Sequence, residues 1–199
     1  MWYAFLQFWC QFLFVIFFSL RVFGRENVPG EGGVLIASNH QSFLDPILIG
    51  VGLKRQIHYM ARRSLFKNIL FRGLIKSLNA FPVKRKGTDV AALKKAIALL
   101  RRGEVVLLFP EGTRTRDGTI GPIEHGFGMI ARRAGVPLVP AVIDGAFEAW
   151  PRTRRIFRFA AASVIFGKPL EPKGEDLSQA VAHSLAQLQQ KIRAAKFRC

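Results

Sequence analysis

"GVLIASNHQSFLDPILIGVG" (residues 33–52) is the stretch that decides the fold expected of this chain. Its first six residues form an apolar run that is typical of a buried strand, and its last seven are typical of a helix. Pro46 disfavours helical backbone at Asp45 and suits the first position of a helix, so Asp45 is a candidate N-cap residue. A start at Ser38 or Asn39 is the alternative. Both predict that a helix follows the strand closely.

The same alternation continues along the chain. Further apolar, β-rich runs predict strands at 57–61, 79–83, 104–109, 137–143 and 162–167. Residues 88–102 have the apolar spacing of an amphipathic helix that Thr88 or Asp89 would cap, and its expected buried face is Val90, Leu93, Ile97 and Leu100. A second such helix near the C-terminus would bury Leu177, Val181, Leu185, Leu188 and Ile192. Alternating strands and helices predict a single α/β domain with a layered sheet.

Composition limits the classes of partner. The 199 residues are 50% apolar, which is enough for one packed core. Lys and Arg number 30 against 13 Asp and Glu, and the formal charge of +17 implies a polyanionic partner: nucleic acid, an acidic membrane surface or a phosphorylated ligand. The only cysteines, Cys10 and Cys199, suggest neither a disulfide framework nor a Cys-rich zinc site, which fits a reducing compartment.

The first 20 residues favour a membrane among these partners. They carry no charge and nine aromatic residues, and as a helix they would extend about 30 Å, roughly the thickness of the hydrocarbon core. The segment lacks the basic start and the small-residue exit of a cleaved signal. It can span the bilayer or lie at its interface, and burial against the domain is the remaining alternative. If it spans, Arg21 and Arg25 place the following domain on the cytoplasmic side.

An imidazole and a carboxylate stand close together in the expected loop. In a continuous helix His40 and Asp45 would point about 140° apart, but a loop lets the ring fold back onto the carboxylate. One ring nitrogen would then meet Asp45 while the other serves as a general base. The plainer alternative is that Asp45 only caps a helix and His40 is a polar loop residue. Ser42 lacks the G-x-S-x-G context of a serine nucleophile.

A second polar segment, "FPEGTRTRDG" (109–118), follows the strand expected at 104–109. Its side chains would emerge at a strand end, where open α/β sheets usually bind ligands. Gly112 allows close approach of the backbone to a ligand, and the planar fork of Arg114 suits a phosphate. Arg116 is a weaker candidate, and "RDG" is good turn chemistry.

Together, "NHQSFLD" and "FPEGTR" resemble the paired signature of the glycerolipid acyltransferases related to 1-acylglycerol-3-phosphate acyltransferase. The resemblance extends through residues 58–87 and 135–145 and covers roughly residues 25–167. It implies a single domain with a mixed central sheet flanked by helices, here residues 24–199. Residues 1–23 would be a membrane anchor or interfacial helix, because members of this family often carry an apolar N-terminal element.

The resemblance also implies roles for individual residues. His40 matches the catalytic base that deprotonates the acceptor hydroxyl, and Asp45 matches its orienting partner. The block that binds the glycerol phosphate corresponds to Glu111, Gly112, Thr113 and Arg114, and Arg85 matches the arginine of the family's middle block. Lys84 or Lys86 beside it is the alternative phosphate ligand. Val139 and Pro140 match a block that resembles part of the acyl-binding wall. The sequence departs from the family where many members have a Lys-Gly pair, since Glu124 and His125 precede Gly126 here.

The resemblance therefore implies transfer of a fatty acyl group from an acyl thioester to a lysophospholipid, 1-acylglycerol-3-phosphate first among the acceptors, in phospholipid biosynthesis. Acyl-CoA or acyl carrier protein would be the donor, with no cofactor and no metal, and the expected location is a membrane with the catalytic domain on its cytoplasmic face. Another lysolipid or hydroxylated lipid acceptor is one alternative, and a basic membrane-attached binding protein without catalysis is another. Nucleic acid is not an expected partner, because no RNA or DNA motif is present. Neither His58, His125 nor His183 has the spacing of a metal hydrolase.

Overall fold

Seven strands form one mixed sheet in the computed structural model, which describes residues 2–84, 89–124, 126–173 and 176–196. The strands are β1 (Arg21–Phe23), β2 (Val34–Ser38), β3 (Ile57–Arg62), β4 (Ala80–Val83), β5 (Val105–Leu108), β6 (Leu138–Asp144) and β7 (Ser163–Phe166). Their order is β1-β7-β6-β2-β5-β3-β4; β6 and β7 pair antiparallel, and the other neighbours pair parallel. The predicted mixed α/β sheet is confirmed, including all six predicted strands.

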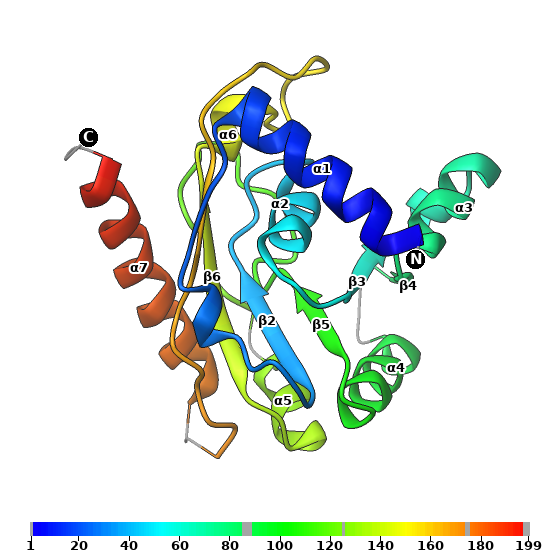
Figure 1. The fold of residues 1–199 in the computed structure, drawn as a ribbon. Coiled ribbons are helices and arrows are strands. Elements are labelled where there is room, and N and C mark those ends of the chain that lie inside the picture. Colours follow the sequence, from blue (N-terminus) through cyan, green and yellow to red (C-terminus); the bar gives the residue numbers. More distant parts are fainter. Residues whose placement is uncertain (1, 85–88, 125, 174–175, 197–199) are drawn as a thin grey trace.

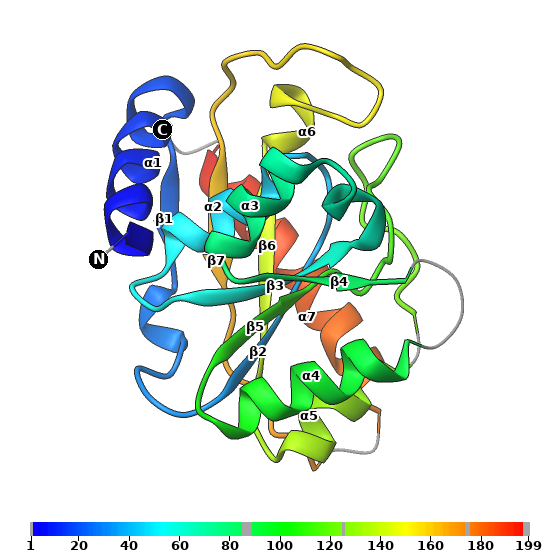
Figure 2. The ribbon, with the colours of Figure 1, turned by 90° about the vertical axis from the view of Figure 1, so that its right-hand side faces the viewer.

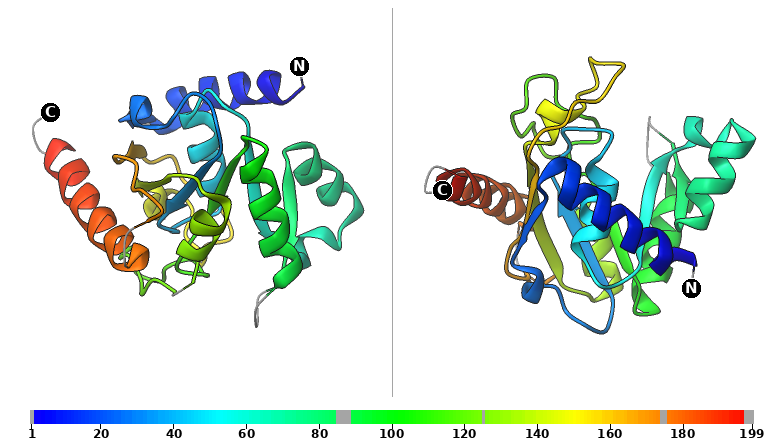
Figure 3. Two further views of the ribbon diagram at one scale, coloured as in Figure 1. Left: turned by 90° about the horizontal axis from the view of Figure 1, so that it is seen from below. Right: turned by 45° about the horizontal axis from the view of Figure 1, so that its top comes forward.

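Helices cover both faces of this sheet (Figures 1 and 3). They are α1 (Trp2–Phe18), α2 (Asp45–Gly52), α3 (Ile69–Ser77), α4 (Val90–Arg101), α5 (Gly128–Ala134), α6 (Ala146–Ala149) and α7 (Leu177–Lys196). Apolar side chains of α1, α2 and α6 pack with one face of the sheet, and those of α4, α5 and α7 pack with the other. The central strands β2, β5 and β6 are buried along their whole length, because helices lie over both sides.

The two predicted amphipathic helices are confirmed. Asp89 caps α4, since its carboxylate accepts a hydrogen bond from the N–H of Ala92 at 3.1 Å. The predicted buried face of α4 is wrong in part: Val90 is exposed, whereas alanines lie against the sheet because their small side chains let the helix approach closely. The buried residues of α4 are Ala92, Ala96, Leu99 and Leu100. In α7 the predicted face is confirmed: Leu177, Val181, Leu185 and Ile192 are buried, and Leu188 is half-buried against the same core.

The start of α2 differs by one residue from the sequence expectation. Leu44 is the N-cap, Asp45 is the first helical residue, and the carboxylate of Asp45 makes no capping bond to its own helix. It accepts instead from the N–H groups of Gln41 and Ser42 in the preceding loop. Since those contacts turn the carboxylate back toward the loop, the predicted N-cap role of Asp45 is wrong, while the helix itself is confirmed.

The N-terminal segment forms α1, which lies against α2 (Figure 1). Tyr3, Phe14 and Phe18 are buried against the domain, and the side-chain amide of Gln7 donates to the carbonyls of Gly50 and Leu53 at 2.7 and 2.6 Å. The opposite face leaves Trp2, Phe5, Phe8, Trp9, Phe12, Leu13, Val15, Ile16 and Phe17 exposed. The division of the chain at residue 23 stays a prediction.

Across the part of the chain that the structure describes, no helix combines the length and the apolar character needed to cross a membrane.

Candidate active site

The two polar segments meet because β2 and β5 are parallel neighbours. Ala37 pairs with Leu108, so both strands end at the same edge of the sheet and release their loops side by side. A main-chain hydrogen bond joins these two loops: the N–H of Thr115 donates to the carbonyl of His40 at 2.8 Å. The prediction that the second polar segment follows a strand end is confirmed, and its part in ligand binding stays a prediction.

His40 and Asp45 form the predicted pair. Nδ1 of His40 lies 2.7 Å from Oδ2 of Asp45, whose side chain is completely buried, whereas the side chain of His40 is 19% exposed. The imidazole stacks on the ring of Phe109, with centroids 4.0 Å apart and planes inclined by 14°. The contact with Asp45 engages Nδ1, so Nε2 is the nitrogen that remains for proton exchange with a substrate.

The carboxylate of Asp45 is held by the loop that it supports. Oδ2 also accepts from the N–H of Gln41 at 2.6 Å and of Ser42 at 2.7 Å. Within the described residues, Oδ1 is buried and has no hydrogen-bond partner. One oxygen therefore collects three contacts, which fixes the loop and the imidazole together.

Glu111 joins the two segments through main-chain contacts. Its Oε1 accepts from the N–H of His40 at 2.7 Å and its Oε2 from the N–H of Gly121 at 2.8 Å. Burial raises the pKa of Glu111 above its ordinary value, and the two hydrogen bonds with backbone N–H groups oppose that rise. Both carboxylate oxygens thus support the backbone around His40. The role of Glu111 in binding substrate stays a prediction.

Gly112 is required by the tight turn that follows. Its φ of 62° lies in the left-handed region, and a Cβ there would lie 2.6 Å from Oε1 of Glu124. Where many family members have a Lys-Gly pair, this chain has Glu124 and His125 before Gly126; His125 lies outside the described residues, and Glu124 places a carboxylate beside Gly112. Gly112 itself lies in the predicted block, and its part in substrate binding stays a prediction.

Three arginines gather beside this turn, and we call Arg62, Arg114 and Arg152 the arginine cluster. The guanidinium of Arg114 lies 3.5 Å from the ring centroid of Phe43. Its pKa is lowered, first by burial and then by the positive charges of Arg62 and Arg152. Nη1 of Arg114 is buried without a hydrogen-bond partner among the described residues. An anion would relieve both the repulsion and the unpaired donor, so the cluster suits a phosphate.

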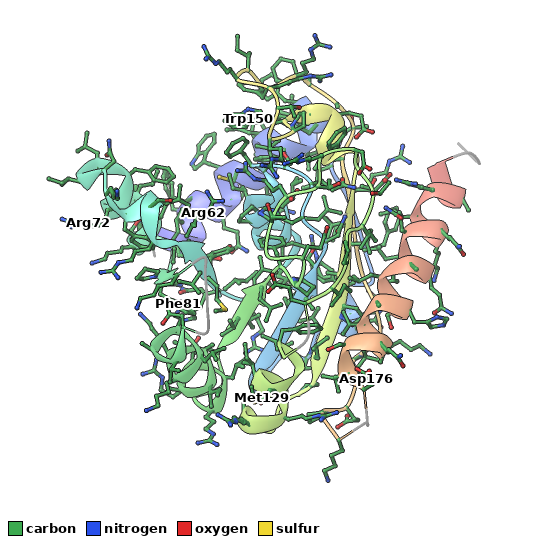
Figure 4. All side chains as sticks on the ribbon, turned by 180° about the vertical axis from the view of Figure 1, so that it is seen from behind. Arg62, Arg72, Phe81, Met129, Trp150 and Asp176 are labelled. Carbon is green, nitrogen blue, oxygen red and sulfur yellow. The ribbon has the colours of Figure 1, made fainter. Side chains whose placement is uncertain are left out.

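Arg152 reaches the cluster from a distant part of the chain. Its Nη1 donates to the carbonyl of Arg114 at 3.2 Å and to Oγ1 of Thr113 at 3.4 Å. Figure 4 shows Arg62 on β3 and Trp150 just beyond α6. Arg62 lies in the block at 58–87 and Arg152 in the basic stretch at 151–158, but neither stretch by itself indicates a contact with Arg114. The predicted Arg85 lies outside the described residues, and Arg116 is exposed.

Asn39 and Ser42, to which the sequence assigns no role in the site, hold the loop around His40 in place. The side chain of Asn39 donates to the carbonyl of Ile143 at 2.9 Å and accepts from its N–H at 2.8 Å. The hydroxyl of Ser42 donates to the carbonyl of Trp150 at 2.8 Å and accepts from the N–H of Leu44 at 3.1 Å. These bonds tie the loop to β6 and to the end of α6. The only feature of the sequence that could have indicated this role of Asn39 is its position directly before His40.

The other predicted positions fall as follows. Val139 and Pro140 are buried in β6, and their part in an acyl-binding wall stays a prediction. His58 lies on β3 and His183 on α7, as ordinary strand and helix residues would.

The comparisons with known proteins assign the fold to a family of acyl-transferring enzymes. A family model described as Acyltransferase matches residues 19–144, and the chain belongs to this family. The family predicted from the two segments is thereby confirmed.

Individual relatives make the comparison more specific. The chain is 37% identical over 153 residues to 1-acyl-sn-glycerol-3-phosphate acyltransferase of Bacillus subtilis (strain 168), covering 76% of this chain and 74% of that protein. It is 31% identical over 173 residues to the chloroplastic BAT2 enzyme of the same description from Brassica napus, covering 85% of this chain and 50% of the relative. The chain therefore spans about half the length of the plant relative. The crystal structure of the 1-acyl-sn-glycerophosphate (LPA) acyltransferase PlsC from Thermotoga maritima superposes with a TM-score of 0.82 at 28% identity, covering 96% of this chain and 80% of that one.

Proposed function

We propose that this protein transfers a fatty acyl group from an acyl thioester to the free hydroxyl of 1-acyl-sn-glycerol-3-phosphate, giving phosphatidic acid for phospholipid biosynthesis. The relatives from Bacillus subtilis, Brassica napus and Thermotoga maritima, which are named for this acceptor, support the proposal. The observation that carries the proposal is the 2.7 Å contact of His40 with Asp45 at the strand edge where the arginine cluster also lies. A base and an anion site side by side suit an acceptor that carries both a hydroxyl and a phosphate.

The geometry supports direct acyl transfer. Nε2 of His40 takes the proton of the acceptor hydroxyl while that oxygen attacks the thioester carbonyl carbon. The tetrahedral intermediate collapses, the carbon–sulfur bond breaks, and the thiolate takes the proton from the imidazolium. The buried carboxylate of Asp45 stabilises the imidazolium and orients its ring. The ester and the free thiol are the products, with no acyl-enzyme intermediate.

The phosphate of the acceptor would lie in the arginine cluster. Arg114 provides a planar fork whose position is fixed by stacking on Phe43. Arg62 and Arg152 add positive charge, and Arg152 also contacts the main chain of Arg114. Binding there orients the glycerol hydroxyl, and orientation of this kind contributes to the rate as an effective concentration. Thioester chemistry needs no metal or redox cofactor, so we propose none.

The donor is an acyl thioester of coenzyme A or of acyl carrier protein. Both share the reacting group, and the basic surface at residues 151–158 suits either the phosphates of coenzyme A or an acidic carrier. Glu124 beside Gly112 gives a specific reason to test other lysolipid acceptors, because a carboxylate there alters the charge near the second segment.

We further propose that α1 lies on the membrane, with the catalytic domain on the cytoplasmic face. The outward face of α1 is aromatic, and such rings favour the bilayer interface. Arginines at 151–158 add attraction to anionic lipid. A lipid-bound position brings the site to an acceptor that resides in the membrane.

The test is acyl transfer to 1-acylglycerol-3-phosphate in detergent micelles, with labelled acyl-CoA and acyl carrier protein offered separately. The parent is compared with His40→Ala, and with His183→Ala on α7 as a matched histidine control. We expect product from the parent and the control, and none above background from His40→Ala with an unchanged circular dichroism spectrum. A parent without product from either donor would refute this acceptor. An active His40→Ala variant would refute the mechanism.

A further inference from the structure

The helix α3 carries its apolar side chains on the outside of the molecule. None of its nine residues is buried, although Ile69, Leu70, Phe71 and Leu74 are large and apolar. Leu70 is 86% exposed and Ile69 71% exposed. Figure 2 shows that α3 lies on the surface above β3 and β4. Single exposed apolar residues are common, but several on one short helix indicate a surface that contacts a partner.

Positive charges surround these side chains. Lys67 precedes the helix, and Arg72 and Lys76 lie within it. Figure 4 shows Arg72 at the outer part of α3. Long cationic side chains can lay their stems along apolar surface and keep their charge in the headgroup region. The combination of exposed aliphatic residues with lysine and arginine therefore fits an anionic bilayer surface.

The surface of α3 continues into that of α1. Nε1 of Trp2, at the start of α1, donates to Oγ of Ser77, at the end of α3, at 3.3 Å. Trp2 is itself 55% exposed, and the aromatic face of α1 runs on from it. The start of α1 and the end of α3 are therefore neighbours on the surface of the molecule.

We propose that α3 is a second membrane-docking element, which inserts Ile69 and Leu70 among the lipids beside α1. This inference rests on the proposed function, because it assumes that the enzyme works on a bilayer. The helix follows β3, which ends at Arg62 of the arginine cluster. Two docking helices fix the tilt of the domain where one would leave it free to rotate, and α3 sets the height of Arg62 relative to the headgroups.

An anionic lipid surface fits α3 better than a protein does. Ile69 and Leu70 are the most exposed apolar residues of the helix and lie adjacent at its first turn, so they protrude. Protruding side chains suit insertion between lipids, whereas a protein partner usually takes a helix face into a groove. Acyl carrier protein is the rival partner, and vesicle binding compared with activity on each donor distinguishes it from a lipid surface.

The experiment measures binding of the full chain to sedimented vesicles of phosphatidylcholine, with and without phosphatidylglycerol. The test variant is Ile69→Asn with Leu70→Asn. The matched control is Val90→Asn with Met129→Gln, since those apolar side chains are also exposed but lie on α4 and α5. We expect the test variant to bind mixed vesicles at least about tenfold more weakly than the parent, because burial of two aliphatic side chains is lost. The control should match the parent.

A second pair of variants tests the charge. Arg72→Gln with Lys76→Gln should weaken binding to mixed vesicles by about tenfold, because each cation adds attraction to an anionic surface. Binding to pure phosphatidylcholine should stay unchanged, because that surface carries no net charge. Unchanged vesicle binding by both the apolar and the charge variants would overturn the proposal. A loss of activity with acyl carrier protein alone, at unchanged vesicle binding, would overturn it in favour of a carrier contact.

Activity in detergent micelles separates this inference from the proposed function. The α3 variants should retain the parent rate on 1-acylglycerol-3-phosphate in micelles and lose rate only on acceptor presented in mixed vesicles. If the parent transfers no acyl group in micelles, the proposed function fails whatever the vesicles show. If the parent is active and the α3 variants bind vesicles as it does, only the docking role fails.

Discussion

Glu111 holds the main chain of His40: its Oε1 accepts the N–H of His40 at 2.7 Å, across 71 positions of sequence. The other oxygen, Oε2, accepts from Gly121 at 2.8 Å. One carboxylate therefore ties the end of β2, the end of β5 and the following turn into a single unit. The loop that carries the proposed base depends on the second segment for its position.

Glu111→Gln should weaken both contacts at once. The glutamine oxygen can accept one N–H, but its NH2 group then faces the other donor, and a buried donor left unpaired costs about 1–3 kcal/mol. We expect the free energy of unfolding in urea to fall by about that amount, and kcat to fall because the backbone of His40 is released. Glu148→Gln, on the exposed face of α6, is the control. Equal urea midpoints for Glu111→Gln and the parent would contradict the role of this carboxylate.

The pKa of Glu111 gives a dependence of stability on pH. Burial raises that pKa above its ordinary value of 4.5, so the folded state holds the proton more tightly than the unfolded chain does. As pH rises from below 4.5 through the folded pKa, the unfolded chain loses its proton first, and this group's contribution to stability decreases. The melting temperature of the parent minus that of Glu111→Gln should therefore decrease with rising pH in this range. A difference that rises with pH would show the opposite shift.

The parts of the site that sequence could predict are those encoded in single segments. Continuous apolar runs identified six of the seven strands, and the spacing of His40 and Asp45 identified their contact. The edge strand β1 escaped notice because three residues, "RVF", carry no periodicity. The exact start of α2 could not be predicted, because the carboxylate of Asp45 accepts from N–H groups of the loop and not from those of its own helix.

The rest of the site arises from sheet order and could not be predicted. Arg62 ends β3 and Arg152 follows α6, and their local sequence does not show that they lie beside Arg114. Parallel pairing of β3 with β5, and of β2 with β5, brings their ends to one edge. The exposure of the aliphatic residues of α3 could not be predicted either. A sequence pattern shows where a helix has an apolar face, but it does not show what covers that face.

Asn39→Leu should destabilise the fold strongly. The asparagine side chain satisfies both the N–H and the C=O of Ile143 inside the core, and leucine satisfies neither. Two buried polar groups without partners cost about 2–5 kcal/mol together. Asn68→Ala, which removes one exposed capping bond from α3, should cost only about 1 kcal/mol. Urea denaturation of both variants checks the comparison, and equal losses would contradict the buried clamp.

Asp45→Asn should remove charge with little change of shape. The amide oxygen can take the place of Oδ2 and its three contacts, while the NH2 group occupies the place of the unpartnered Oδ1. Without the negative charge the imidazolium is less stable, so kcat should fall by about 10³-fold. Asp176→Asn is the control, because asparagine caps α7 nearly as well as aspartate does. A kcat within twofold of the parent would contradict the role of the carboxylate.

Arg114→Lys should separate shape from charge in the arginine cluster. Lysine keeps the positive charge but loses the planar stack on Phe43 and the two-pronged contact with a phosphate. We expect the KM for 1-acylglycerol-3-phosphate to rise by about tenfold, because one good charge-assisted hydrogen bond contributes about 1.5–3 kcal/mol. The KM for acyl-CoA should stay the same, since the cluster is proposed to hold the acceptor. Arg133→Lys, on α5 at the far end of the sheet, should change neither constant. A KM that rises for the donor instead would assign the cluster to the donor and leave the acceptor phosphate to other residues.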